Sequence, residues 1–433
     1  MSKKFYGKDY NEKNNIVRKS KAMCKDYIIS FKQKDNKFRV LDGESLTVST
    51  KDVIPRDIKK FKMLTVNDNE ATDAHLFEYA KMFRGWCKEL YDDKECSFYY
   101  SKCFSDYTAV TIFFNNRCDY KNHKNISPTE YKWFEQCANY GIQYLQKENT
   151  KVSGYGYDFK NQYGLALHSD YKIPTKEGAE ETLKKLPKKS ADLRHGFYKV
   201  KITCANDDFK KVFAYSKHNV YLCYSLAFAM DNKKKFGVEI ELVQDKYPNA
   251  YLYEDEDLVT LKSITDKWFN DLVGLKKRYP KNRLIKHLFS SAWGHLNKAN
   301  VMRVHMEEMQ KLDVGCTMDH DYQIVEYHEY GKNIYWEVLN NNSPYKYNIR
   351  LKPWITAISR NMTAEKVLLD CDNVVRVHTD GIVYRNKMEF DDENFIAEDK
   401  TTGTIHWVNN NCYHNETIGY KSKGFDSYVK KND

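Results

Sequence analysis

Residues 374–384 constrain the possible folds of this chain more than any other stretch, and their sequence is VVRVHTDGIVY. Two β-rich runs flank an Asp-Gly pair, which is a strong signal for a β-hairpin because glycine accepts a positive φ in the turn. The pattern predicts that Asp380 lies at the tip of a tight hairpin, where a carboxylate can bind a hard cation such as Mg²⁺. Aspartate is also common in ordinary surface turns. A functional role for Asp380 therefore requires a second carboxylate elsewhere in the chain.

The composition indicates a folded, soluble, intracellular protein. Its 433 residues are enough for about two to three structural units. Hydrophobic residues make up 41% and aromatic residues 15%, which favours a packed core over global disorder. The net charge of +10 is compatible with a polyanionic partner. The 11 cysteines form no CxxC pair, the N-terminus lacks an apolar signal region, and no run approaches 18 apolar residues, so we expect free thiols and no membrane span.

The first 150 residues give no firm motif. Short β-rich runs at 27–31 and 109–114 predict strands. Asp42 and Glu44 form a DxE pair, which is the spacing that begins some metal-dependent exonuclease sites. Such a site needs further carboxylates, and the next hundred residues offer none that we can place. The pair therefore carries little weight.

Two helices have clear start signals. Residues 127–147 are predicted to be helical, because Ser127, Pro128 and Glu130 suit a helix start. A second helix is predicted to begin at Pro353 and to lead into the hairpin. Its buried stripe is predicted to consist of Ile355, Ile358, Met362 and Leu369.

Between these helices the pattern is mixed. Residues 173–178 mark a turn, residues 196–204 alternate as a β-strand does, and a further strand is expected within 236–243. The acidic run at 254–257 is interpreted as a solvated surface loop. Three possible metal ligands fit no standard zinc spacing and are interpreted as structural, namely Cys316, His320 and His328.

Residues 261–300 have a helical pattern in two segments. In the second segment, a core stripe at helical spacing consists of Ile285, Phe289, Ala292 and Leu296. A different face carries Lys286, Ser290, Trp293 and Asn297. That face can be a solvated surface, or it can hold a phosphate against Lys286 and a base against an aromatic ring. Periodicity alone leaves both interpretations open.

Residues 154–167 contain a candidate for the second carboxylate, in the sequence GYGYDFKNQYGLAL. The segment DFKNQYG resembles DxxSLYP, the first polymerase motif of family B DNA polymerases, with Asp158 and Tyr163 at matching positions. The segment KHLFSSAWG resembles the second motif, KxxxNSxYG. It matches at Lys286, Ser291 and Gly294, and it has Ser290 in place of Asn and Trp293 in place of Tyr.

The hairpin and the C-terminal region resemble the later motifs of the same family. VHTDGI resembles YxDTDS, with Asp380 at the second aspartate and His378 in place of the first. NCY resembles KxY, with Tyr413 retained and Asn411 in place of Lys, and KSKG at 421–424 resembles the Lys-Gly segment that follows. Five motifs in the family's order cover roughly residues 127–425. The resemblance is strongest to the protein-primed phage and plasmid type.

This resemblance implies an α+β fold of the right-hand polymerase type, with an antiparallel-sheet palm, helical fingers, a reduced thumb and a short N-terminal domain. In chain order, we expect an N-terminal α+β domain with a reduced or absent exonuclease, a first palm segment, an insertion typical of protein-primed members, fingers, a second palm segment with the metal-binding hairpin, and a reduced thumb or primer-binding tail. Their expected boundaries are 1–126, 127–204, 205–260, 261–300, 301–399 and 400–433.

The resemblance also implies nucleotidyl transfer from dNTPs to a primer, with two Mg²⁺ ions for which Mn²⁺ can substitute. The implied metal ligands are Asp158, Asp380 and the main-chain carbonyl of Phe159. Nucleotide binding would involve Tyr163 under the sugar, Lys286 at the triphosphate, Ser290, and Trp293 against the nascent base pair. The implied contacts to nucleic acid are Gly294, Thr379, Tyr413, Lys421 and Lys423.

Each of these roles has a structural alternative. Asp158 can be a helix cap, Lys286 a solvated side chain and Trp293 a core residue. The sequence also departs from the family. The first carboxylate of the third motif is replaced by His378, and the lysine of KxY is replaced by Asn411. The absence of a complete exonuclease set makes us expect no proofreading, and the 53 residues after Asp380 make us expect low processivity without a clamp-like partner.

Three functions follow from these observations. The first is a compact DNA polymerase that acts on primer-template DNA and dNTPs, with a terminal protein as a further primer candidate. The second is an inactive polymerase-like protein that binds nucleic acid as a replication partner or scaffold. The third is a polymerase with untemplated or RNA-templated output. The resemblance suggests a virus or linear plasmid as the source and the host cytoplasm or nucleus as the location.

Overall fold

A computed structural model of the chain describes residues 28–32, 37–41, 48–51, 62–63, 85–90, 92–93, 106–120, 123–296, 298–330, 333–347, 349–417 and 419–422. The chain divides into two compact units. The larger unit consists of residues 119–266, 296–326 and 337–433, and the smaller of 1–118, 267–295 and 327–336. The DxE pair of Asp42 and Glu44, and also Lys423, lie outside the described residues.

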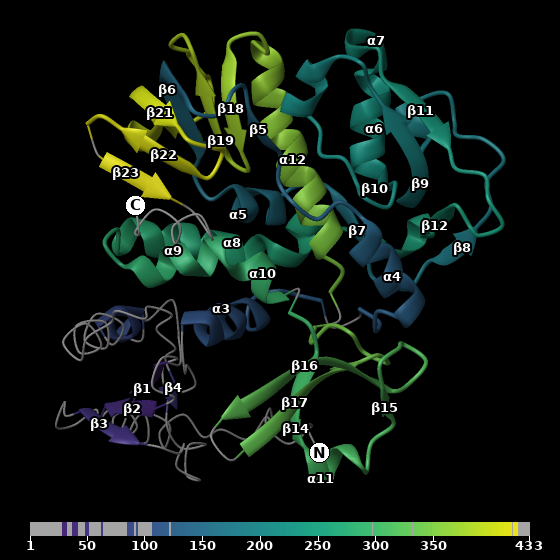
Figure 1. Cartoon of the computed structure of the whole chain (residues 1–433), viewed down its shortest axis with the longest axis vertical. Coiled ribbons are helices and arrows are strands. Elements are labelled where there is room, and N and C mark those ends of the chain that lie inside the picture. The colour runs from purple at the N-terminus through teal and green to yellow at the C-terminus, as the bar shows by residue number, and fades with distance from the viewer. Residues whose placement is uncertain are drawn as a thin grey trace. The chain divides into compact units, whose positions relative to one another are not determined.

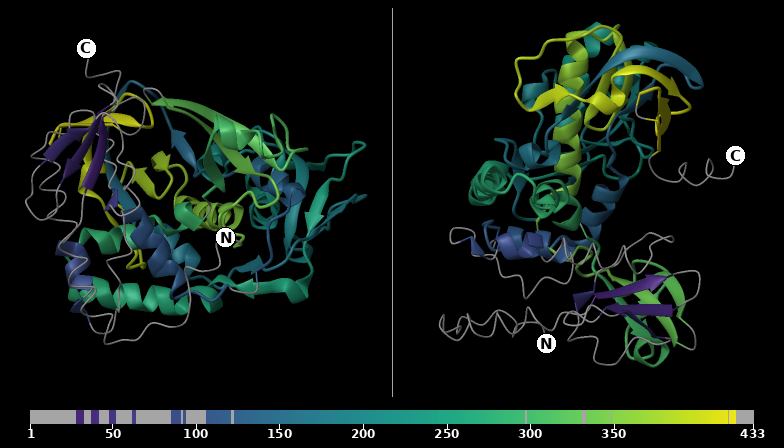
Figure 2. Two further views of the ribbon diagram at one scale, coloured as in Figure 1. Left: turned by 90° about the horizontal axis from the view of Figure 1, so that it is seen from below. Right: turned by 90° about the vertical axis from the view of Figure 1, so that its left-hand side faces the viewer.

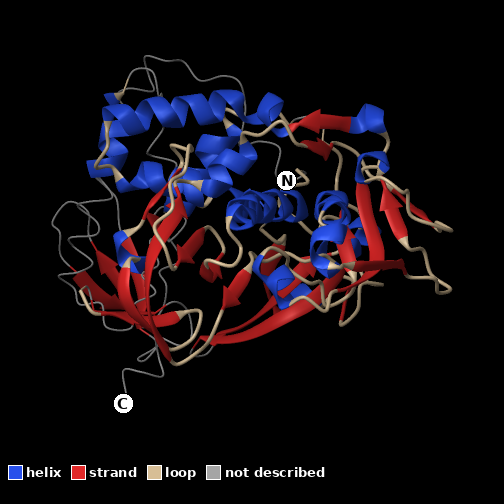
Figure 3. Ribbon diagram, turned by 90° about the horizontal axis from the view of Figure 1, so that it is seen from above, coloured by secondary structure: helices blue, strands red, loops and turns tan. Residues whose placement is uncertain are grey.

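The larger unit contains a curled antiparallel sheet of eight strands among the described residues (Figures 1 and 3). Its order is β23-β22-β21-β6-β19-β18-β5, and β20 also pairs with β6. The strands are β5 (Gln143–Leu145), β6 (Thr150–Phe159), β18 (Val374–His378), β19 (Gly381–Tyr384), β20 (Phe395–Ala397), β21 (Gly403–Trp407), β22 (Cys412–Asn415) and β23 (Gly419–Ser422). The C-terminal strands, yellow in Figure 2, extend the sheet on the side of β6 away from β19.

The predicted hairpin is confirmed as β18 and β19. His378 pairs with Gly381, so that Thr379 and Asp380 are the two turn residues. The expected positive φ at glycine is wrong, because Gly381 is already the first residue of β19 and Thr379 takes the left-handed φ of 61°. Two hydrogen bonds hold this β-branched residue there, from Thr379 N to the Ile142 carbonyl at 2.9 Å and from Thr363 Oγ1 to the Thr379 carbonyl at 2.8 Å.

Helix α12 (Lys352–Leu369) forms where the sequence predicts it, with proline in its first turn. Ile355 and Ile358 are completely buried. The prediction that Leu369 belongs to the buried stripe is wrong, because this last residue of the helix is 64% exposed. The helix contacts α5 (Gln162–Leu167), α6 (Cys223–Asp231) and β19. It therefore lies beside the hairpin that carries Asp380.

The helix predicted at 127–147 is shorter than expected. Helix α4 covers Pro128–Gln136, and its predicted start is confirmed by a 3.2 Å hydrogen bond from Glu130 N to Ser127 Oγ. The backbone becomes extended at Cys137, and Gln143–Leu145 then pair with β18 as strand β5. Pairing within the sheet thus overrides the local helical pattern.

A second antiparallel sheet of the larger unit has the order β10-β9-β12-β8, and β11 also pairs with β9. Its strands are β8 (Ala179–Glu181), β9 (Gly196–Thr203), β10 (Val220–Leu222), β11 (Glu239–Leu242) and β12 (Ala250–Leu252). The strands predicted at 196–204 and within 236–243 are confirmed as β9 and β11. Other short elements are β7 (Lys172–Pro174), β13 (Leu258–Thr260), η3 (Ser190–Asp192), η4 (Asp207–Lys211), α7 (Lys233–Phe236) and η5 (Asp255–Asp257).

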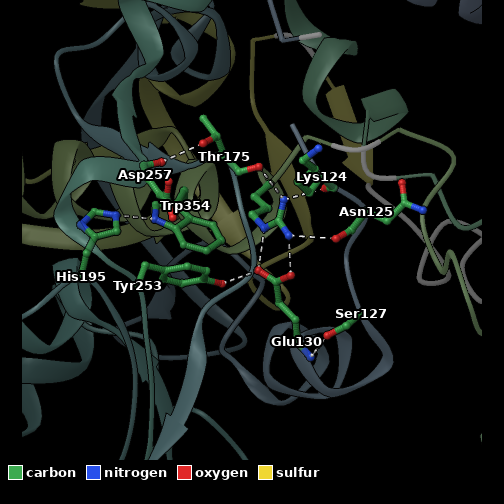
Figure 4. A network of polar contacts seen from close by, with 10 residues as sticks. Lys124, Asn125, Ser127, Glu130, Thr175, His195, Tyr253, Asp257 and Trp354 are labelled. Atoms are coloured by element: carbon green, nitrogen blue, oxygen red, sulfur yellow. Dashed lines mark hydrogen bonds and ion pairs between the residues drawn. The ribbon is translucent and has the colours of Figure 1, made fainter. Parts of the chain in front are cut away.

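A buried ion pair joins distant segments of the larger unit (Figure 4). The Arg350 guanidinium donates to both oxygens of Glu130 at 2.6 and 2.7 Å, and both side chains have no exposed area. The guanidinium also donates to the carbonyls of Lys124 and Asn125, and Tyr253 Oη donates to Glu130. Close by, Trp354 Nε1 donates to His195 Nε2 at 2.9 Å, and burial lowers the pKa of His195 to about 4.

Residues 267–295 of the predicted helical region belong to the smaller unit. Residues 109–114, which we expected to form a strand, belong to helix α3 (Asp106–Asn115). Ala109, Val110, Phe113 and Phe114 are buried at helical spacing, and α3 packs against α9 (Arg283–Ser290). Packing thus outweighs the weak strand preference of this run. The predicted stripe of Ile285, Phe289, Ala292 and Leu296 is confirmed as buried.

The other elements are α8 (Leu261–Arg278), α10 (Ala292–Leu296), α11 (Met306–Met309) and two four-stranded sheets. One sheet consists of β1 (Ile28–Lys32), β2 (Lys37–Leu41), β3 (Val48–Lys51) and β4 (Lys62–Met63). The other consists of β14 (Val301–His305), β15 (Val314–Gly315), β16 (Tyr322–Tyr330) and β17 (Asn333–Asn340). Within the described ranges, no helix combines the length and the apolar character needed to cross a membrane.

Candidate active site

The structure brings the two predicted aspartates together in the large sheet. Asp158 lies near the end of β6 and pairs with Gly381, the residue after Asp380. Phe159 N donates to the Asp380 carbonyl at 3.2 Å. A Cβ added to Gly381 would lie 3.4 Å from Asp158 Oδ1, so the glycine leaves this carboxylate directly beside the turn. Asp158 on β6 thus lies beside the turn that carries Asp380, although the two residues are far apart in the sequence.

Local sequence explains how Asp158 is presented. Its neighbours Tyr157 and Phe159 are buried, and their rings pack against Phe395. Because side chains alternate along a strand, Asp158 lies on the opposite face, where it is half-buried. Gly156 allows close packing, since a Cβ there would lie 1.9 Å from Thr401 Oγ1. Aromatic packing therefore anchors one face of β6, and Asp158 lies on the other face, which it shares with Gly156.

Tyr163 belongs to the same neighbourhood. Burial and the negative charge of Asp380 together raise the pKa of Tyr163 to about 12, so its hydroxyl stays protonated at neutral pH. The preceding residue, Gln162, donates from Nε2 to Thr363 Oγ1 at 2.7 Å. Thr363 in turn donates to the Thr379 carbonyl. A short polar chain thus links α5, α12 and the turn that carries Asp380.

Sequence reasoning missed Arg376, which lies on β18 and is only 4% exposed. Its Nε and Nη2 donate to the Asn410 carbonyl at 3.1 and 2.6 Å, and its guanidinium lies 4.7 Å from the ring centroid of Trp407. Burial lowers the pKa of Arg376 to about 10, and the negative charges of Asp158 and Asp380 oppose this decrease. A cation therefore remains near the two carboxylates at neutral pH. The available signal was an arginine within the apolar run VVRV.

The two aspartates fit a magnesium site that substrate would complete. Among the residues that the structure describes, no group of three or more His, Cys, Asp or Glu side chains could hold a metal ion. Mg²⁺ is often held by only one or two carboxylates, with water and substrate phosphates as the other ligands. Asp158, Asp380 and the Phe159 carbonyl are hard oxygen donors of the required kind. The donor set is therefore of the chemical kind that Mg²⁺ prefers.

The predicted residues of the second motif lie in the smaller unit. Lys286 is exposed, and Ser290 Oγ donates to the Lys286 carbonyl within α9 at 3.0 Å. Trp293 is half-buried, and a Cβ added to Gly294 would meet nothing within 4 Å. The helix is interrupted at Ser291, between α9 and α10. Asn297 lies outside the described residues.

Of the C-terminal candidates, Tyr413 lies on β22 and Lys421 on β23. Tyr413 is 6% exposed, and its ring centroid lies 4.8 Å from that of Trp407. Lys421 pairs with Tyr413 through the backbone of β23. The Arg376 guanidinium lies 5.8 Å from the Tyr413 ring. Arg376 therefore connects β22 to the hairpin that carries Asp380.

Comparison with known proteins gives a structural relationship. No family model and no curated sequence matches the chain. The structure is similar to phi29 DNA polymerase complexed with primer-template DNA and incoming nucleotide substrates, with a TM-score of 0.54, 12% identity, 88% of this chain covered and 67% of the other. For phi29 DNA polymerase complexed with single-stranded DNA, the TM-score is 0.52 at 11% identity. This match covers 82% of this chain and 61% of that polymerase chain. The chain thus spans 61–67% of that polymerase's length. It has a DNA polymerase-like fold that is distantly related in structure to that polymerase.

Proposed function

We propose that this chain is a DNA-directed DNA polymerase that transfers nucleotidyl groups from dNTPs to a primer with two divalent metal ions. The observation that carries the proposal is the pairing of Asp158 with the residue after Asp380 in the central sheet of a polymerase-like fold. The motifs select these two aspartates independently of the backbone pairing that places them side by side. Such a coincidence is expected of a catalytic site whose ligands come from separate segments.

Bound Mg²⁺ would lower the pKa of the primer hydroxyl and stabilise charge on the leaving pyrophosphate. The residues of the chain would position the reactants. Asp158, Asp380 and the Phe159 carbonyl would hold the metal. Tyr163, which stays protonated beside Asp380, would lie under the sugar and disfavour a ribonucleotide.

The remaining predicted roles belong to the same proposal. Lys286, Ser290 and Trp293 would bind the triphosphate and the nascent base pair, within fingers at 261–300. Thr379, Tyr413, Lys421, Lys423 and Gly294 would contact the nucleic acid, where lysine charge adds affinity without sequence preference. The palm would comprise 127–204 and 301–399, with the insertion at 205–260, a tail at 400–433 and a non-proofreading N-terminal domain at 1–126.

A primer-extension assay tests the proposal. The wild-type protein should incorporate dNTPs on a primer-template with Mg²⁺ or Mn²⁺. Asp158→Asn and Asp380→Asn should each reduce incorporation by at least about 10³-fold, because a lost metal ligand removes electrostatic stabilisation of the transition state. Binding of the same DNA should change little. His414→Gln, an exposed change on β22, is the matched control. Full activity in either aspartate variant would refute the site assignment.

An inactive, DNA-binding relative is the second candidate, and the specific observation in its favour is His378 at a position where the motif has a carboxylate. In that case the wild-type protein binds DNA with strong salt dependence and incorporates nothing with either metal. Sequencing the product of a reaction without added template distinguishes the third candidate, untemplated synthesis. If a terminal protein is the primer, labelled nucleotide becomes attached to that protein.

A further inference from the structure

Helix α9, which carries Lys286, packs against residues of the N-terminal region that belong to the same compact unit. It contacts α3, whose residues Phe113 and Phe114 are buried (Figure 1). The buried residues of α9 itself are Leu284, Ile285, Leu288 and Phe289. Lys286 lies between them in the sequence and is exposed. One face of the helix is therefore packed against the N-terminal region, and another presents the lysine.

Asn282 joins the start of α9 to a helical segment at residues 85–90. Its Oδ1 accepts a 3.0 Å hydrogen bond from Leu284 N, which caps the first turn of α9. Its Nδ2 donates to the Trp86 carbonyl at 3.0 Å and to Glu89 Oε2 at 2.9 Å. These three partners fix the orientation of the amide, because a main-chain N–H requires the oxygen and a carbonyl requires the nitrogen. The side chain of Asn282, which is 5% exposed, thus both caps α9 and attaches it to the N-terminal region.

The turn that precedes α9 is also held at its other end. Arg278, the last residue of α8, donates from Nε to Asp93 Oδ2 at 2.8 Å and from Nη2 to Asp93 Oδ1 at 3.2 Å. The Asp93 side chain is only 5% exposed. Earlier in α8, Trp268 is completely buried, and its ring centroid lies 5.5 Å from that of Phe114 on α3. Polar contacts from the N-terminal region therefore hold both ends of the turn at residues 279–282.

We propose that Asn282 is a positioning residue for Lys286, and that the N-terminal region thereby takes part in nucleotide binding. This inference rests on the proposed polymerase function, in which Lys286 binds the triphosphate. Lys286 follows Asn282 by four residues, which is about one helical turn, so a shift at the start of α9 moves the lysine. Stabilisation of a triphosphate depends on the exact position of the ammonium group. Capping alone would be served equally well by serine or aspartate, whereas asparagine adds the donor that the attachment needs.

Exchanging donor and acceptor tests this attachment. Asn282→Asp keeps the capping oxygen, removes both donors and places a second carboxylate beside Glu89. The KM for dNTP should rise by about tenfold, while affinity for primer-template DNA stays within about threefold of wild type. Glu89→Gln returns a donor from the other side, so Asn282→Asp/Glu89→Gln should recover most of the lost affinity for dNTP. The matched control is Asn206→Asp, the same change at the exposed capping residue of η4, which should leave KM unchanged.

A second cycle shows whether Asn282 acts through Lys286. In a Lys286→Ala background, Asn282→Asp should raise the KM for dNTP no further, because the group that it positions is already absent. A merely structural contact would instead lower the fraction of folded enzyme, which reduces the apparent kcat and leaves KM unchanged. An unchanged KM in Asn282→Asp, or an equal further rise in the Lys286→Ala background, would overturn the proposal.

Deuterium exchange supplies a readout that does not depend on activity. A peptide covering 283–290 should exchange faster in Asn282→Asp than in wild type and should return towards wild type in Asn282→Asp/Glu89→Gln. Unchanged exchange in Asn282→Asp would refute the attachment. If wild type incorporates no dNTP, the proposed function fails on its own. The exchange measurement then still decides the attachment, and calorimetric titration with Mg²⁺ and dATP decides whether Asn282 affects nucleotide binding.

Discussion

At the scale of single residues, Arg350 and Glu130 offer a measure of what a buried ion pair contributes here. Arg350→Met leaves the Glu130 charge unpaired in the core, and we expect the free energy of unfolding to fall by about 3–5 kcal/mol. Arg194→Met, which breaks an exposed pair with Glu181, should cost about 1 kcal/mol or less. Urea unfolding of both variants measures the difference. Equal losses of unfolding free energy in the two variants would show that burial of the Glu130 charge does not cause the loss in Arg350→Met.

Arg350→Met can be combined with Glu130→Gln, which removes the charge that the first change leaves unpaired. The double variant should therefore recover some of the lost stability, although Arg350 also donates to main-chain carbonyls that remain without this donor. If the double variant loses as much stability as the two single variants together, the lost contacts to the main-chain carbonyls cost more free energy than the unpaired Glu130 charge.

Two buried histidines predict how stability depends on pH. Burial lowers the pKa of His195 to about 4, and burial together with the Arg350 charge lowers the pKa of His123 to about 4. Both take up protons more readily in the unfolded chain, where the pKa is about 6.5. The contribution of the two neutral imidazoles to the free energy of unfolding is therefore complete above pH 6.5. It is lost as the pH falls towards 4, at about 1.4 kcal/mol per pH unit for each imidazole.

Chemical denaturation between pH 7 and pH 4.5 tests this dependence. His195→Gln keeps an acceptor for Trp354 Nε1, and it should flatten the loss of stability at low pH. His414→Gln, at an exposed site, should leave the slope unchanged. A slope that is the same in both variants would assign the acid sensitivity to other groups.

At the scale of elements, Thr363 connects α12 to the turn that carries Asp380. Thr363→Val keeps the shape of the side chain and removes the donor to the Thr379 carbonyl. We expect a loss of about 1 kcal/mol in stability and a larger proportional loss in primer extension, because the turn would hold Asp380 less precisely. Thr356→Val is the control, since its hydroxyl bonds only within α12 among the contacts of the described residues. Equal effects on extension would argue against the link.

Sequence patterns were most informative where residues close together in the sequence determine the local structure. The start of α4 follows from Ser127, Pro128 and Glu130, and the hairpin follows from alternating apolar residues around an Asp-Gly pair. The patterns failed where a distant partner decides. Residues 109–114 are helical because they pack against α9, and residues 143–145 are a strand because β18 pairs with them. Such partners cannot be seen in a local window.

The candidate site shows the same division. The motifs that predict Asp158 and Asp380 are local, and the pairing of β6 with β19 places Asp158 beside the turn that carries Asp380. Arg376 was not predicted, because its role depends on Asn410 and on two aromatic rings from β21 and β22. The position of the positive φ was also missed. It depends on which two residues fall between paired His378 and Gly381.

At the scale of the whole molecule, the fold is similar to that of a known polymerase although the sequence is not. Identity to phi29 DNA polymerase is 10–12%, and neither a family model nor a curated sequence matches the chain, yet the TM-scores reach 0.54. This is understandable if only a few positions are fixed by chemistry, because core positions accept many apolar residues of similar volume. The mixed α and β class was accessible from the sequence. The pairing of the eight described strands of the large sheet could not be predicted from the sequence.

The central position of β6 in the large sheet determines how its backbone amides exchange hydrogen with solvent. This strand is bonded to β19 on one edge and to β20 and β21 on the other, so its amides lose protection only when the whole sheet separates. In deuterium-exchange mass spectrometry, a peptide covering 155–159 should be among the last to take up deuterium. A peptide covering β11, which has β9 as its one partner among the described strands, should exchange much earlier. The backbone beneath Asp158 would then report global unfolding.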